Sequence, residues 1–244
     1  MKKLTLGISM TALILSLVAC SSGKTSESTT DEVKVTAETS TAKPTESEEA
    51  VECNANNEAV IEYDANNLES MLTYVETASD EIVRNIENSS SKLLEDLGDT
   101  YSSYNANKYL VTEFYDETLE SGKEFYKALQ TLGINYYKCL ASQGIDDYDT
   151  WNGAMDDFYD AWDGAMDDFY DAWDGAYDDI YDECDDLTEG YSNAWSDMYN
   201  EYSDAWSLLY DEHSDTWSLL YDNHSDVWSG FYDGKTDIDE ILGL

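Results

Sequence analysis

Tryptophan recurs at intervals of eleven residues through the second half of this chain, and this interval restricts the secondary structure that the segment can adopt. All seven tryptophans lie on one register, and Cys184 stands at the single position that interrupts it. The units that begin at Trp151 and Trp162 differ at one position, so tandem duplication explains the segment. The register contains Trp151, Trp162, Trp173, Trp195, Trp206, Trp217 and Trp228.

Eleven residues correspond to three turns of an α-helix at about 3.67 residues per turn. Counted from each tryptophan of the early units, apolar side chains follow at positions three, four, seven and eight, on one face of such a helix. Aspartate follows at positions five, six and nine, on the opposite face. A β-strand is unsuitable, because an odd repeat would move the apolar side chains to the other face of a sheet at every unit. The repeat therefore predicts an amphipathic helix.

Three glycines divide the sequence into segments of similar length, and glycine commonly ends a helix. They are Gly98, Gly144 and Gly190. We expect an all-α fold of long amphipathic helices, which could form an up-down four-helix bundle. The alternative is a helical rod over 147–233, because the tryptophan register crosses Gly190 unchanged. The expected helices lie near 56–97, 101–142, 147–189 and 192–233.

The predicted domains follow from the same pattern. Residues 51–144 form a helical hairpin region, and residues 145–234 form the repeat region rich in tryptophan, tyrosine and aspartate. Residues 235–244 form a C-terminal tail.

The charge balance restricts the partners of this chain. It carries 54 acidic and 12 basic residues, a formal net charge of −42, and such a chain cannot neutralise nucleic-acid phosphates. No lysine or arginine occurs between Cys139 and Gly234, so the aspartates of the repeats repel one another without relief. The helices are stable only if their aromatic face is covered, because burial of large side chains must outweigh this repulsion.

The tryptophan stripe is therefore the candidate partner-binding surface. Whatever part of it the chain does not bury itself is available to a second copy of the chain or to a partner in the cell envelope. The stripe consists of Trp151, Trp162, Trp173, Trp195, Trp206, Trp217 and Trp228.

Cysteine and histidine suggest no catalytic or metal centre. In an up-down bundle Cys53 and Cys139 lie at the same end, so they could form a disulfide. Cys184 packs as a small apolar residue at a tryptophan position, or links two chains. His213 and His224 lie about 16 Å apart along a helix and cannot share a metal ion. We expect no cofactor and no metal site, only weak association of divalent cations with the acidic surface.

The first residues read as a targeting signal. Two lysines precede an apolar run of 16 residues, Leu4 to Ala19, which ends in the sequence Leu17-Val18-Ala19-Cys20. This sequence resembles the lipobox of bacterial lipoproteins. The resemblance implies that residues 1–19 are a signal peptide and that Cys20 becomes the lipidated N-terminus, with palmitate among its acyl groups. Residues 20–50 are rich in serine, threonine and glutamate and read as a disordered linker.

These observations predict a lipoprotein held by its lipid on the extracytoplasmic side of the bacterial cell membrane. No enzyme motif stands out, so we expect a non-enzymatic, acidic helical module that interacts with envelope partners or acts as a spacer. The alternative is a helical bundle that binds an apolar, carbohydrate or cationic ligand. An extracytoplasmic enzyme is a third hypothesis, which would require a closed pocket of carboxylates with unequal pKa values.

Overall fold

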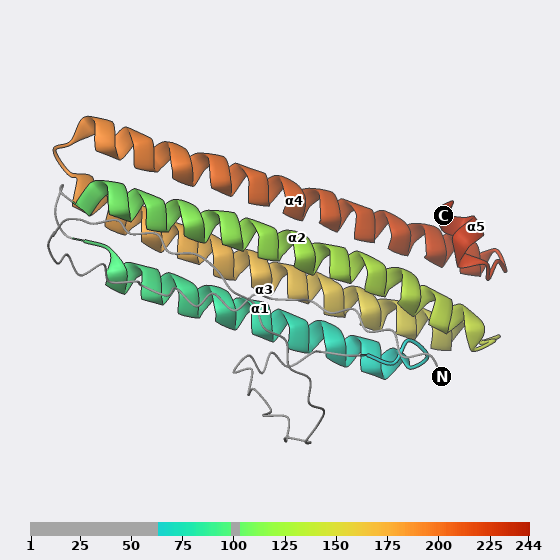
Figure 1. Ribbon diagram of the computed structural model, residues 1–244. Coiled ribbons are helices and arrows are strands. Elements are labelled where there is room, and N and C mark those ends of the chain that lie inside the picture. Colours follow the sequence, from blue (N-terminus) through green and yellow to red (C-terminus); the bar gives the residue numbers. More distant parts are fainter. Residues whose placement is uncertain (1–62, 99–102) are drawn as a thin grey trace, which may run out of the picture. The chain divides into compact units, whose positions relative to one another are not determined.

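The computed structural model describes residues 63–98 and 103–244, and its regular secondary structure there is helical (Figure 1). The predictions for the signal peptide, for Cys20, for the linker and for Cys53 concern residues outside these ranges. The helices are α1 (Leu68–Asp96), α2 (Tyr104–Ser142), α3 (Tyr148–Thr188), α4 (Ser192–Tyr232) and the short α5 (Ile238–Leu242).

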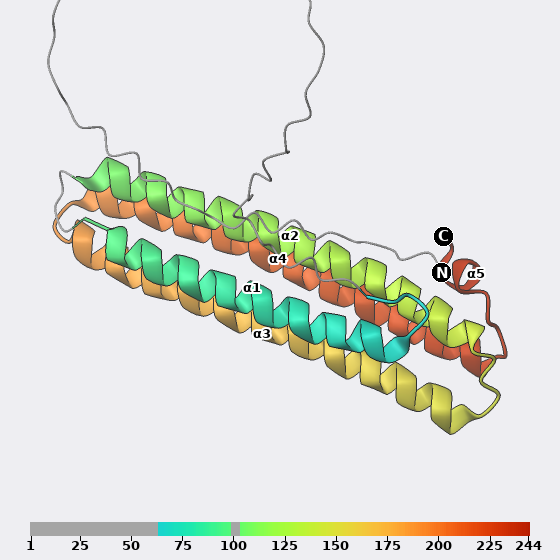
Figure 2. The same ribbon diagram turned by 60° about the horizontal axis from the view of Figure 1, so that its bottom comes forward.

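The four long helices form a bundle in which α1 and α3 run in one direction and α2 and α4 run in the other (Figures 1 and 2). Helix α1 packs against α2 and α3, and α4 packs against the same two helices. The connection from α2 to α3 therefore crosses a diagonal of the bundle, which places the parallel pairs α1/α3 and α2/α4 side by side. The predicted all-α up-down bundle is confirmed.

The rod alternative is wrong, because the chain reverses direction between α3 and α4. Gly190 adopts φ +82°, a left-handed conformation that only glycine adopts without strain. The amide N–H of Tyr191 donates to the carbonyl of Thr188 at 2.9 Å and closes the turn. The tryptophan register continues across this turn because the turn and the two helix ends beside it together contain one whole eleven-residue repeat. The register by itself therefore could not distinguish a turn from a continuous helix.

Two ends of the fold differ from the sequence prediction. Helix α1 begins at Leu68 rather than near residue 56, and the side chain of Asn67 caps it by accepting a hydrogen bond from the Ser70 amide at 3.2 Å. The predicted tail contains α5, whose Ile238 is buried and whose Ile241 packs against Gly230 of α4. The tail is therefore part of the folded bundle.

The eleven-residue period is visible in three helices of the core, not only in the tryptophan-rich pair. Gly122 and Gly133 of α2 lie eleven residues apart, and each faces a phenylalanine of α3, Phe169 and Phe158 respectively. Leucines of α4 that also lie eleven residues apart, Leu209 and Leu220, complete the two contacts. Two equivalent layers of the core are thus built from the same residue types.

These layers give a matched pair of substitutions. A Cβ atom on Gly122 would lie 2.8 Å from Leu209 and 2.9 Å from Phe169, whereas one on Gly133 would lie 3.4 Å or more from its neighbours. We expect Gly122→Ala to lower the free energy of unfolding by about 1–3 kcal/mol through overpacking. Gly133→Ala is expected to be neutral or to raise it by up to about 1 kcal/mol, because alanine favours helix. Urea unfolding followed by circular dichroism measures both, and equal effects would contradict the packing described.

Candidate functional site

The helices α3 and α4 meet along a seam in which every tryptophan of α4 is hydrogen-bonded to α3. Each indole N–H donates a hydrogen bond to a side-chain oxygen of α3. From one tryptophan to the next, the donor moves eleven residues forward along α4 and the acceptor moves eleven residues back along the antiparallel α3. The distances are 2.8 Å for Trp206 to Asp174, 2.8 Å for Trp217 to Asp163 and 3.0 Å for Trp228 to Asn152, and Trp195 donates to Asp185. We call these four hydrogen bonds the indole ladder.

Beside the ladder, each tryptophan of α4 stacks on the tyrosine four residues later. The interplanar angles lie between 5° and 14°, so the rings are nearly parallel. The four tyrosines are between 41% and 67% exposed, although their helix is packed in the bundle. We call this set the aromatic row: Trp195 with Tyr199, Trp206 with Tyr210, Trp217 with Tyr221, and Trp228 with Tyr232.

Helix α3 adds a second line of tyrosines to the same seam. Each one meets a row tyrosine with ring centroids 6.0–6.5 Å apart and planes inclined by 70° or more. Tyr148 is 46% exposed, and Tyr159, Tyr170 and Tyr181 are half-buried. The result is a regular aromatic surface that repeats about every 16 Å along the helices, the rise of eleven helical residues.

The structure divides the predicted tryptophan stripe into two parts. Trp162 and Trp173 of α3 are fully buried and Trp151 is 8% exposed, so these three belong to the core and do not form a surface. Their rings pack edge to face against tryptophans of α4, with centroids 5.8–6.1 Å apart. The seven tryptophans share one register in the sequence, but the α3 tryptophans lie in the core and the α4 tryptophans lie at its edge. The partly exposed members are Trp195, Trp206, Trp217 and Trp228.

Cys184 explains why one rung differs from the others. It occupies the α3 position at which a tryptophan would face Trp195, and it is 4% exposed. Without a large ring opposite, Trp195 is 37% exposed, the highest value among the seven tryptophans. Burial raises the pKa of the Cys184 thiol to about 12, which fits a packed residue rather than a reactive one.

The predicted disulfide requires the start of α1 and the end of α2 to lie at the same end of the bundle. Cys139 lies near the end of α2 and is 5% exposed, and its Sγ accepts a hydrogen bond from Gln143 at 3.7 Å. The start of α1 lies at the same end, because Asn135 of α2 donates to the hydroxyl of Tyr63 at 2.8 Å. The Cys53–Cys139 pairing stays a prediction, since Cys53 lies outside the described residues.

The two histidines occupy equivalent places between α2, α3 and α4. Nδ1 of His213 lies 3.0 Å from the hydroxyl of Tyr126, and the imidazole also packs on Tyr170 at 5.2 Å between centroids. His224 packs on Tyr159 at the same distance of 5.2 Å. Burial lowers the pKa of both histidines, which favours the neutral imidazole. In residues 63–98 and 103–244 no three metal-ligating side chains converge.

The seam carries negative charge without internal neutralisation. The ion pairs formed by Lys108 and Lys123 of α2 lie on the other side of α4, with Glu201 and Glu212. No lysine or arginine belongs to α3 or α4. Desolvation and the neighbouring carboxylate of Asp163 raise the pKa of Asp167, which is the effect expected of crowded acids.

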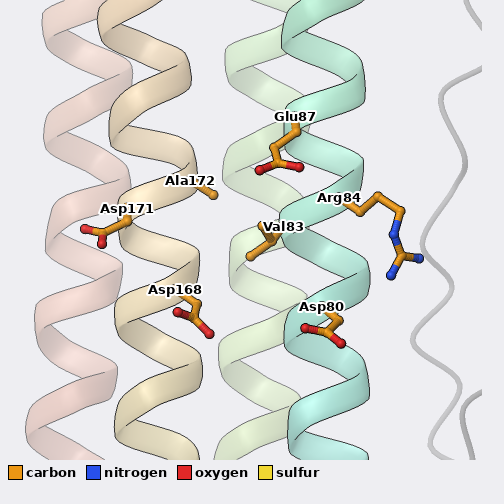
Figure 3. Close-up of a pocket in the computed structure, with 7 residues that line it drawn as sticks. All are labelled: Asp80, Val83, Arg84, Glu87, Asp168, Asp171 and Ala172. Atoms are coloured by element: carbon orange, nitrogen blue, oxygen red, sulfur yellow. The ribbon is translucent and has the colours of Figure 1, made fainter.

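A second acidic feature is an open groove of about 610 Å³ between α1 and α3 (Figure 3). Glu87 and Asp168 point into the space between the helices, and Arg84 extends away from α3. The lining consists of Asp80, Val83, Arg84, Glu87, Asp168, Asp171 and Ala172. The carboxylates stand along two helices rather than around a centre.

Comparison of the chain with protein-family models, with curated protein sequences and with solved structures finds no match in any of the three. Among the described residues, no helix combines the length and the apolar character that a membrane span requires. The site is therefore interpreted from its own geometry and charge.

The repeats themselves suggest a test of the indole ladder. Asn152 serves Trp228 as acceptor at the position that aspartate holds in the next two units, so the ladder needs an oxygen and not a charge. Asp163→Asn and Asp174→Asn are expected to raise the free energy of unfolding by about 0.2–0.5 kcal/mol each, because they relieve like-charge repulsion along α3.

Asp163→Leu is the matched control, since it removes the charge and the acceptor together and leaves the Trp217 indole without this bond. Thermal unfolding at low and high salt compares the variants, and the gain of the asparagine variants should shrink at high salt. Equal stabilisation by leucine would show that the hydrogen bond contributes nothing.

Glu117 of α2 predicts how stability depends on pH. Burial, followed by the charges of Glu113 and Asp116, raises the pKa of Glu117 to about 7, and its Oε2 is buried without a hydrogen-bond partner. A carboxyl whose pKa is raised in the folded state favours folding below its ordinary pKa, and this contribution is lost as the pH rises through 7. Glu117→Gln should therefore be more stable than the parent at pH 8, with the difference shrinking towards pH 4.5.

The exposed Glu120 on the same helix provides the charge-matched control. Melting temperatures of Glu117→Gln and Glu120→Gln are measured from pH 8 to pH 4.5. Identical pH profiles for the two variants would contradict the role assigned to the buried carboxyl.

Proposed function

We propose that this chain is a lipoprotein anchored on the extracytoplasmic side of a bacterial cell membrane, where it acts as a non-enzymatic interaction module through the aromatic row. The anchoring part rests on the sequence Leu17-Val18-Ala19-Cys20 and its resemblance to a lipobox. The binding part rests on one observation: the bundle buries a full core of rings and still exposes a regular row of Trp–Tyr pairs.

The exposed rings support binding rather than a purely mechanical role. Contiguous apolar surface that stays exposed in a folded protein commonly marks an interaction site. In α3 the rings of Trp162 and Trp173 are used in the core, whereas in α4 Tyr210 and Tyr221 are more than 40% exposed although they stack on tryptophans. A spacer would need no such row.

The arrangement of the carboxylates supports a non-enzymatic role. General acid–base catalysis by carboxyl groups relies on pairs whose environments separate their pKa values within a pocket. The seam and the α1–α3 groove instead expose their carboxylates along helix surfaces. This arrangement suits recognition of a large partner along the length of the bundle.

The anchoring part is tested by expressing the full chain in a bacterial host. The parent chain should sediment with the membrane fraction and incorporate labelled palmitate, and Cys20→Ala should lose both properties because the thiol that carries the lipid is gone. Cys184→Ala, which removes a buried thiol, should behave as the parent does. Membrane sedimentation of Cys20→Ala with palmitate still attached would refute lipidation at Cys20.

The binding part is tested with tryptophan fluorescence of the purified full chain. Emission should shift to shorter wavelength when a bacterial envelope fraction is added, because covering the four α4 tryptophans removes them from water. The double variant Tyr210→Leu/Tyr221→Leu should reduce the shift, and Tyr109→Leu on the exposed surface of α2 should not. An unchanged shift in the double variant would exclude the aromatic row as the binding face.

A further inference from the structure

We infer that the partner of the aromatic row is a basic polypeptide segment whose lysine or arginine side chains lie over the exposed Trp–Tyr faces. This inference rests on the proposed function and specifies its partner. The observations that carry it are the exposed tyrosines of the Trp–Tyr pairs, the carboxylates beside them and the absence of lysine and arginine from the two helices that form the seam.

The ring faces are suited to cations. A lysine ammonium or an arginine guanidinium is attracted to the face of tryptophan or tyrosine, and such contacts are individually weak at exposed sites. Tyr210 stacks on Trp206 with planes inclined by 11°, and Tyr221 stacks on Trp217 at 9°. Although they stack on tryptophans, Tyr210 and Tyr221 remain 42% and 45% exposed, so part of each tyrosine is available to a third group.

Carboxylates border the Trp206 and Trp217 rungs of the row, whereas the Trp228 rung has Asn152 in this place. Asp174 and Asp163 accept hydrogen bonds from the indole N–H groups of Trp206 and Trp217. Asp178 accepts a hydrogen bond from Tyr202 at 3.0 Å in the same seam. A cation over the tyrosine face would therefore meet both a ring quadrupole and a nearby carboxylate, which no group of α3 or α4 now neutralises.

The charge also argues against the other occupants of such a face. A second copy of the chain would bring its own uncompensated carboxylates against those of the first, and a phosphate-bearing surface would be repelled in the same way. A neutral glycan could stack on the rings, but it would gain nothing from the charge. A basic partner is the one occupant for which rings and carboxylates act in the same direction.

The spacing of the row indicates the form of the partner. Rungs repeat every eleven helical residues, about 16 Å apart, and five residues of an extended chain cover about the same distance. A flexible segment with a basic residue at every fifth position can place one cation at each rung, because its backbone can turn between rungs and bring successive side chains to the same side. Since each contact is weak, several must form at once, and linked contacts strengthen one another through effective concentration.

Peptides of defined spacing test the inference directly. The probe is a 16-residue serine–glycine peptide with arginine at positions 1, 6, 11 and 16, labelled for fluorescence anisotropy against the full chain in non-ionic detergent. A peptide of the same composition with its four arginines contiguous is the control for simple charge attraction. We expect the spaced peptide to bind at least tenfold more tightly, and to weaken as salt is raised.

Ring faces are separated from hydroxyl groups by paired variants of the chain. Tyr210→Phe/Tyr221→Phe keeps both faces and should bind as the parent does, whereas Tyr210→Leu/Tyr221→Leu keeps apolar bulk without a ring and should bind at least tenfold more weakly. Tyr109→Leu, on α2 and outside the row, should leave binding unchanged. Circular dichroism verifies that all variants stay helical.

The inference would be overturned by equal binding of the spaced and contiguous peptides, by equal binding of the leucine and phenylalanine variants, or by self-association of the parent chain that the leucine variant abolishes. Binding of a neutral oligosaccharide such as chitohexaose, lost in the leucine variant while the arginine peptide does not bind, would refute a basic partner and still support the row as the binding face. The proposed function and this inference therefore fail separately.

Discussion

Repulsion between carboxylates in α3 and α4 is the constraint on which the rest of this structure depends. Neither helix contains a lysine or arginine, and aspartates stand close together on the outer face of each repeat. Such helices are unfavourable alone, since aspartate and glycine are poor helix formers and like charges repel along a helix. Burial of rings such as Trp162, Trp173 and Phe169 offsets this repulsion, and it requires the two helices to pack face to face.

Duplication of one short unit explains the regularity of the packing. When two helices with the same eleven-residue period run antiparallel, a contact made once recurs in every unit. The indole ladder and the stacked Trp–Tyr pairs arise in this way, and the glycines of α2 repeat at the same interval. Asn152 and Cys184 show which positions tolerate change: an acceptor can lose its charge, and one tryptophan position can be filled by a small side chain.

The same regularity connects the fold to the proposed binding role. Residues that stabilise the seam on its inner side leave tyrosines exposed on its outer side, so a row of similar Trp–Tyr pairs comes with the fold. A row of this kind recognises length and spacing in a partner better than it recognises any single side chain. An anchor at Cys20 would hold that row at a membrane surface, where a long partner could reach several rungs.

Much of this architecture was predictable from the residues alone. The period of eleven identified the helices, because only a helix keeps the apolar side chains of Trp151 and Trp162 units on one face. Gly144 and Gly190 marked two turns, and both adopt positive φ. The start of α1 at Leu68 and the inclusion of α5 were missed, because a single capping side chain and a small apolar contact decide them.

The tertiary structure alone decided which tryptophans are core and which are surface. All seven share one register, so the register does not distinguish Trp173, which is fully buried, from Trp206, which is half-buried. The difference arises because α3 has α1, α2 and α4 around it, whereas α4 contacts α2, α3 and the short α5 and keeps residues such as Tyr210 and Tyr221 exposed. Periodicity shows that the tryptophans lie on one face of each helix. Only the packing of the other helices determines whether that face is buried or exposed.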